Sequence, residues 1–288
     1  MIEAFLRYDF LQNALWVGIM VGFLAPILGV FLVVRRLSLI ADALSHITLS
    51  GIAFSLLLGK SIPFFSMLNP LYIGMVFSVG GALLIERLRN SFRHYQEVAI
   101  PIILSGGIGL GVLFISLADG FNNDLFNYLF GSVMAVSRSD VWTILFITLV
   151  VSFVLVVFYK EFFFLSFDEE QATVSGLNRR FFHILFIVMV ALVIAASMRV
   201  VGILLVSSLM TLPVAAAIRF ARGFKQMFIY SVLFSQISVL SGLMAAFQLD
   251  IAPGGTIVLI AVIIFIGAVS FEKIKHGKVV HRFIGRAG

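Results

Sequence analysis

The sequence contains no cysteine, only 12% charged residues and no polar stretch long enough to form a soluble domain. The absence of cysteine excludes a disulfide framework and a thiolate metal site. The scarcity of charge excludes an ordinary soluble domain, in which about 25% of residues are charged. Hydrophobic residues make up 61% of the chain, and the mean hydropathy is +1.13. Because apolar runs of about 18 or more residues recur along the chain, we predict an all-α polytopic membrane protein.

The apolar runs predict a single transmembrane domain over 1–288 with about nine spans. These are 11–34, 37–58, 64–85, 98–118, 140–159, 181–197, 200–218, 227–247 and 253–271. Segment 125–136 is too short to cross a membrane, so we expect it to be re-entrant or interfacial. The stretch "MIEAFLRYDF" lacks a basic region followed by a cleavage site, so the first run is expected to be a retained helix.

Basic residues predict the orientation of these spans. With the N-terminus outside, the outer side holds four of them, and the inner segments hold 16 of the 20. The outer four are Arg7, Lys60, Arg138 and Arg199, and the inner set is Arg35, Arg36, Arg87, Arg89, Arg93, Lys160, Arg179, Arg180, Arg219, Arg222, Lys225, Lys273, Lys275, Lys278, Arg282 and Arg286. This asymmetry predicts a cytoplasmic C-terminus with a basic tail over 272–288, since cytoplasmic loops are enriched in Lys and Arg.

The stretch "RRLSLIADALSHITLSG" (35–51) places Asp42 and His46 well inside the second predicted span. Ionisable groups in a membrane helix are costly, and residues at i and i+4 share one helical face. A carboxylate with an imidazole suits Zn²⁺ and tolerates Mn²⁺ or Fe²⁺. The structural alternative is that the two side chains hydrogen-bond each other, or hydrogen-bond Ser45, Thr48 or another helix. Because two ligands are too few for a closed site, water or a second copy of the chain is expected to complete it.

Hydroxyl side chains accompany this pair in two spans. Pro213, in "SSLMTLPVAAA", is expected to kink the seventh span, and nearby Ser207, Ser208 and Thr211 can satisfy the freed backbone groups. Ser45, Ser207 and Thr211 are candidates for lining a polar path, with helix packing as the alternative.

The loop "FFFLSFDEEQATVSGLNRRF" predicts a short amphipathic helix over about 167–177, ended by Gly176. Such a helix can lie on the bilayer, but the cytoplasmic leaflet is anionic and repels the acidic residues 168–170. Docking into a partner protein is therefore the favoured interpretation.

Four stretches resemble a known family: "RRLSLIADALSHITLSGIA" (35–53), "YLFGSVMAVSRSD" (128–140), "FDEEQATVSGL" (167–177) and "MRVVGILLVSSLMTLPVAAA" (198–217). The chain resembles the membrane subunits of bacterial ABC importers for divalent metals, the zinc and manganese permeases served by cluster A-I binding proteins. The resemblance covers essentially the whole chain and implies a multi-pass protein of the bacterial plasma membrane.

The resemblance also implies partners and sites. It implies a homodimer, two cytoplasmic ATPase subunits, an extracellular metal-binding protein, and a cation site at Asp42 and His46. The loop is similar to the ABC-importer coupling sequence, which assigns ATPase coupling to Asp168, Glu169, Glu170, Gln171, Ala172 and Gly176. Gln171 departs from the alanine of that pattern. ATP hydrolysis is expected on the separate subunits, so this chain is expected to be a transport subunit and not an enzyme.

The wording "ADALSH", with Thr48 and Ser50 after it, looks more like zinc permeases, so we expect Zn²⁺ as the transported ion and no permanently bound cofactor or nucleic acid. A manganese or iron importer of the same family is the alternative. A proton-coupled secondary metal transporter and a permease for metal chelates also stay open. An intramembrane metalloprotease is disfavoured, since no H-E-x-x-H helix is present.

Overall fold

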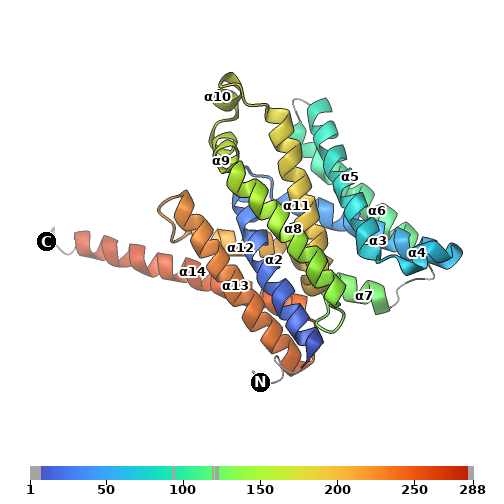
Figure 1. Cartoon of the computed structure of the whole chain (residues 1–288). Coiled ribbons are helices and arrows are strands. Elements are labelled where there is room, and N and C mark those ends of the chain that lie inside the picture. Colours follow the sequence, from blue (N-terminus) through green and yellow to red (C-terminus); the bar gives the residue numbers. More distant parts are fainter. Residues whose placement is uncertain (1–7, 93–94, 119, 121–122, 285–288) are drawn as a thin grey trace.

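The computed structural model describes residues 8–92, 95–118, 120 and 123–284, and helices account for most of them (Figure 1). In chain order the elements are α2 (Asp9–Val34), α3 (Leu39–Ser61), α4 (Pro63–Met67), α5 (Pro70–Ser91), η1 (Gln96–Val98), α6 (Ala99–Leu117), α7 (Asn123–Phe130), α8 (Arg138–Val157), α9 (Tyr159–Phe167), α10 (Glu169–Val174), α11 (Arg179–Val201), α12 (Ile203–Ile218), α13 (Phe224–Leu249) and α14 (Pro253–Ile284). The prediction of an all-α polytopic membrane protein is confirmed.

Eight helices in the described chain are long and apolar enough to cross a membrane, and the remaining predicted span, the seventh at 200–218, is short. Segment 200–218 corresponds to α12, whose 16 residues extend about 24 Å at 1.5 Å per residue, less than a hydrocarbon core of about 30 Å. Gly202 alone separates α12 from α11. Its positive φ of 82° reverses the chain sharply, in a conformation that suits glycine.

The predicted start of the third span differs from the structure because a proline begins a new helix. The third span, expected over 64–85, begins at Pro70, and Pro63–Met67 forms the separate helix α4. The side chain of Asn69 caps α5 by accepting a hydrogen bond from the backbone N–H of Leu71 at 3.1 Å. Segment 125–136 is the short helix α7 followed by non-helical chain up to the start of α8, so it does not cross as a helix.

The helix α3 is held between α5 and α6, on the right of Figure 1. Glycines allow this approach: a Cβ at Gly107 of α6 would lie 3.1 Å from the backbone nitrogen of Ile47, and one at Gly74 of α5 would lie 3.1 Å from Thr48. The hydroxyl of Ser50 donates to the carbonyl of Gly107 at 2.6 Å. These contacts fix the rotation of α3 about its axis and thereby the direction in which Asp42 and His46 point.

The molecule has two ends that carry different polar groups. We call one the α10 end: it holds α10, the start of α3 and the turn 219–223, and Phe167 packs against Phe224 there at 5.5 Å between ring centroids. We call the other the α7 end, where α7 and the α11–α12 junction meet (Figure 1). The helices between them run alternately from one end to the other, so the basic residues near α10 stay grouped at one end.

Candidate functional site

Asp42 and His46 both lie on α3, but Asp42 is in its first turn near the α10 end and not well inside the span as predicted, because α3 begins at Leu39. Their separation of four residues places the two Cβ atoms about 5–6 Å apart on one face. Both side chains are half-buried within the single chain, whereas their neighbours Ala43 and Leu44 are fully buried. The carboxylate and the imidazole can therefore face a common ligand without leaving the helix.

The hydroxyl residues predicted to line a path occupy different surroundings. Ser45 is 1% exposed, and its hydroxyl donates to the carbonyl of Ala41 at 2.8 Å. Ser207 and Thr211 are half-buried on α12, which packs against α3, and Thr211 donates to the carbonyl of Ser207 at 2.9 Å. The roles of Ser45, Ser207 and Thr211 in lining a path stay predictions.

The pair supplies two ligands, and within the described residues no group of three or more His, Asp or Glu side chains could hold a metal ion. A closed structural site for a metal such as zinc needs about four ligands, while an open site keeps exchangeable positions. The assignment of Asp42 and His46 as cation ligands therefore stays a prediction.

A second polar group, the Glu169 cluster, joins α10 to the membrane helices. It consists of Glu169 on α10, Arg35 at the end of α2, and His183 and Arg179 on α11. Oε1 of Glu169 lies 2.7 Å from Nε2 of His183 and 3.3 Å from Nη2 of Arg35, and Oε2 lies 2.9 Å from Nη2 of Arg179. One carboxylate therefore ties three elements together.

Burial makes this cluster stronger than a surface ion pair. The side chains of Arg35 and His183 are 5% and 3% exposed, and that of Glu169 is 32% exposed. Because a carboxylate only accepts, Nε2 of His183 donates to Glu169, and the guanidinium of Arg35 lies beside the ring and over Phe186 at 5.4 Å. The hydrogen bond from His183, aided by the charges of Arg179 and Arg35, lowers the pKa of Glu169 to about 2 against the opposing effect of burial.

The predicted coupling segment forms a short exposed helix. Asp168 caps α10 by accepting from the backbone N–H of Gln171 at 2.9 Å, and Gly176 follows the helix with a φ of 87°. Ala172 is buried, while Glu170 and Gln171 are exposed. One side of α10 is therefore anchored to the bundle and the other side is available to a partner.

A third polar group, the Arg199 cluster, lies at the α7 end. Arg199 pairs with Asp140 at 3.2 Å and donates to the amide oxygen of Asn69 at 3.1 Å and to the hydroxyl of Tyr128 at 3.0 Å. Asp140 is 1% exposed and also accepts from Asn69 at 3.0 Å. This cluster joins α5, α7, α8 and α11 at one point.

Sequence reasoning missed both clusters. It used Arg35 and Arg199 only as markers of orientation and left His183 without a role. The signal was present in each case as an ionisable residue at the edge of an apolar run. The partners, however, are 134 residues apart for Arg35 and Glu169 and 59 residues apart for Asp140 and Arg199, so spacing does not reveal the pairs.

The long apolar helices of the fold define a multi-pass membrane protein. The family model described as "ABC 3 transport family" matches residues 7–272. The chain is 34% identical over 271 residues to the manganese transport system membrane protein MntC of Listeria monocytogenes, covering 94% of this chain and 93% of that protein. It is 33% identical to the manganese import system permease protein ScaB of Streptococcus gordonii, covering 92% and 94%.

A solved structure has the same fold. The chain is similar to PsaBC from Streptococcus pneumoniae in complex with Fab, with a TM-score of 0.80, 31% identity and 93% of both chains covered. The chain belongs to the ABC 3 transport family. It is a multi-pass permease subunit of a bacterial plasma-membrane ABC transporter, as the sequence resemblance implied.

Proposed function

We propose that this permease imports Mn²⁺, with Asp42 and His46 as its transient cation ligands. The observation that carries the proposal is the half-buried carboxylate–imidazole pair on one face of a membrane helix. Such a pair is expensive in lipid unless it has a function. A carboxylate lowers the cost of bringing a dication into low dielectric, and a neutral imidazole adds a nitrogen ligand.

Manganese replaces zinc as the favoured ion. The sequence motif around Asp42 favoured zinc, but a carboxylate and an imidazole can bind either metal. The relatives named above are manganese transport proteins, and this chain aligns with nearly the whole length of each. They favour the manganese alternative. An oxygen-rich shell completed by water also suits Mn²⁺ better than a closed tetrahedral site does.

A second copy of the chain is proposed to face this pair across a two-fold axis. Two copies bring two carboxylates and two imidazoles to one cavity, which is enough to surround one cation. The half-buried hydroxyls of Ser207 and Thr211 on the neighbouring helix α12 suit the wall of such a cavity. An extracellular metal-binding protein delivers the ion on the α7 side, consistent with the predicted orientation.

Energy is proposed to enter at α10, against which cytoplasmic ATPase subunits dock. The exposed side chains of Glu170 and Gln171 face the partner, and the Glu169 cluster transmits the displacement. Arg35, which Glu169 contacts at 3.3 Å, precedes Asp42 by seven residues and stands at the entrance to α3. A movement of α10 therefore reaches the helix that carries the cation ligands.

Metal accumulation in starved cells tests the cation site. Cell-associated manganese and zinc are measured for the wild type, Asp42→Asn and His46→Ala at equal membrane abundance. Asp250→Asn is the matched control, because it removes a carboxylate from the end of α13, where the positive φ of 51° is tolerated by asparagine. Loss of manganese accumulation in the first two variants alone supports the proposal. Unchanged accumulation in both means that the pair is structural, and loss of zinc alone means that the ion is wrong.

The coupling role is tested separately, by comparing Glu169→Gln with Glu170→Gln in the reconstituted complex. Glu169→Gln is expected to keep ATPase subunits bound but to lower the manganese transported per ATP hydrolysed. Glu170→Gln is expected to weaken assembly instead, since its side chain is exposed. A proportional loss of hydrolysis and transport in Glu169→Gln would show that the cluster is not a transmission element.

A further inference from the structure

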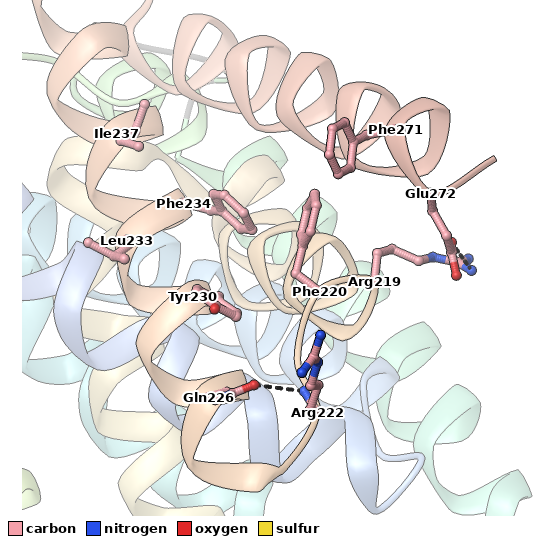
Figure 2. Close-up of a pocket in the computed structure, with 10 residues that line it drawn as sticks. All are labelled: Arg219, Phe220, Arg222, Gln226, Tyr230, Leu233, Phe234, Ile237, Phe271 and Glu272. Atoms are coloured by element: carbon pink, nitrogen blue, oxygen red, sulfur yellow. Dashed lines mark hydrogen bonds and ion pairs between the residues drawn. The ribbon is translucent and has the colours of Figure 1, made fainter. Parts of the chain in front are cut away.

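An open groove lies at the α10 end, away from the cation ligands, between the end of α12, the start of α13 and the outer part of α14. Its volume is about 970 Å³. Figure 2 shows Arg219 and Arg222 at one end of the groove, and Phe220, Phe234 and Phe271 together in its floor. The ring centroid of Phe220 is 5.9 Å from that of Phe234 and 5.8 Å from that of Phe271. None of these residues has a role in the metal path proposed above.

The lining changes from polar to apolar along α13. Gln226 lies beside Arg222 at the polar end, Tyr230 follows, and Leu233 and Ile237 continue along the same helix (Figure 2). From Gln226 to Ile237 the helix rises about 16 Å at 1.5 Å per residue. Half of a hydrocarbon core of about 30 Å is about 15 Å, so the groove is long enough to take the acyl chain of a lipid in one leaflet.

The polar end of the groove carries positive charge. Arg219 donates to Glu272 at 3.1 Å, which is the one ion pair between described residues that line the groove. The side chain of Arg222 is exposed at the rim, and its backbone N–H donates to the side-chain oxygen of Gln226 at 2.9 Å. Two guanidinium groups and one carboxylate leave one positive charge beside an apolar channel.

We propose that this groove binds one anionic phospholipid of phosphatidylglycerol type, with its phosphate at Arg222 and one acyl chain along Phe234 and Ile237. Basic pockets between membrane helices on the cytoplasmic side suit such headgroups. Guanidinium forks bind phosphate oxygens in a bidentate manner. A second copy of the chain is a poorer occupant, because a two-fold contact through this surface would oppose two identical basic rims.

Brominated lipids test the proposal on the assembled permease–ATPase complex in phosphatidylcholine vesicles. Replacing Trp16 and Trp142 by phenylalanine and introducing Tyr230→Trp leaves one tryptophan in this chain, and that tryptophan lies in the groove. The same complex without Tyr230→Trp gives the fluorescence of the ATPase subunits, which is subtracted. Brominated phosphatidylglycerol is expected to quench the groove tryptophan at lower mole fraction than brominated phosphatidylcholine. Arg222→Gln is expected to reduce this preference about fivefold, the factor that corresponds to ≈1 kcal/mol per basic residue near an anionic surface.

Lys225→Gln is the matched control, since it removes a positive charge from an exposed neighbour that does not line the groove. It is expected to keep the preference, and Arg222→Lys is expected to restore most of it. Equal quenching by the two lipids, or an equal loss in Arg222→Gln and Lys225→Gln, would overturn the proposal. Quenching by neither lipid would mean that a protein surface covers the groove. If inorganic phosphate abolished the preference for phosphatidylglycerol, the groove would be an ion site without a lipid. Because quenching requires no transport, failure here is distinguishable from failure of the manganese proposal.

Discussion

The Glu169 cluster yields a quantitative prediction about stability. Glu169→Gln keeps the size of the side chain and a hydrogen-bond acceptor for His183, but it leaves the guanidinium of Arg35 buried at 5% exposure without its carboxylate. Breaking a buried pair costs 3–5 kcal/mol, and an exposed pair contributes 0–1 kcal/mol. Since Glu169 is 32% exposed, we expect an intermediate loss of about 2–3 kcal/mol in the free energy of unfolding.

The assay is denaturant unfolding of the purified permease in micelles, arranged as a double-mutant cycle. Arg179→Gln is the control, because its side chain is 46% exposed and its loss is expected to cost about 1 kcal/mol or less. Arg35→Met combined with Glu169→Gln removes both buried charges, so the double variant is expected to lose less than the sum of the single variants. Equal and small effects of Glu169→Gln and Arg179→Gln, or additive effects of Arg35→Met and Glu169→Gln, would show that the buried pair does not stabilise the fold.

Three further predictions address other parts of the chain. Gly202→Ala is expected to lower the stability by about 2 kcal/mol or more, because alanine is strained at a φ of 82° and its Cβ meets the backbone of α7; thermal unfolding of the purified chain measures this. The sequence has no cysteine, so a single introduced thiol can be labelled selectively. Thr211→Cys is expected to react with a charged thiol reagent if the side chain borders an aqueous path, whereas Phe153→Cys, at a position 69% exposed on α8 and expected to face lipid, is not. Labelling in intact membranes compares the two variants. The stability that ionised Glu169 contributes is expected to be fully present above pH 4.5 and to be lost as the pH falls toward 2, because its folded pKa is depressed. The difference in unfolding free energy between wild type and Glu169→Gln should narrow in that window.

Much of the fold could be predicted because hydropathy and proline act locally. The long apolar runs and the non-crossing segment around α7 follow from length and composition alone. The start of α5 could not be placed, since the choice between one helix and the pair α4 and α5 depends on the cap that Asn69 provides at Pro70. Three residues used to assign orientation, Arg7, Arg93 and Arg286, lie outside the described residues, as does the end of the predicted basic tail at 285–288.

The candidate site was only partly predictable for a related reason. The i, i+4 spacing of Asp42 and His46 is a property of one helix, so the sequence contains it. The Glu169 cluster depends on three elements that meet only after folding, and Arg35 gave no local sign of its partner. The half-burial of Thr211 beside α3 likewise depends on which face of α12 the neighbouring helices cover.

The helix α11 has polar anchors near both of its ends. His183 belongs to the Glu169 cluster and Arg199 to the Arg199 cluster. Arg199 lies 16 positions after His183, which corresponds to about 24 Å of straight helix. A rigid rod fixed at two points cannot tilt at one end without straining the other. A displacement of α10 is therefore expected to strain the α7 end, and whatever coupling free energy links the two ends acts equally in both directions.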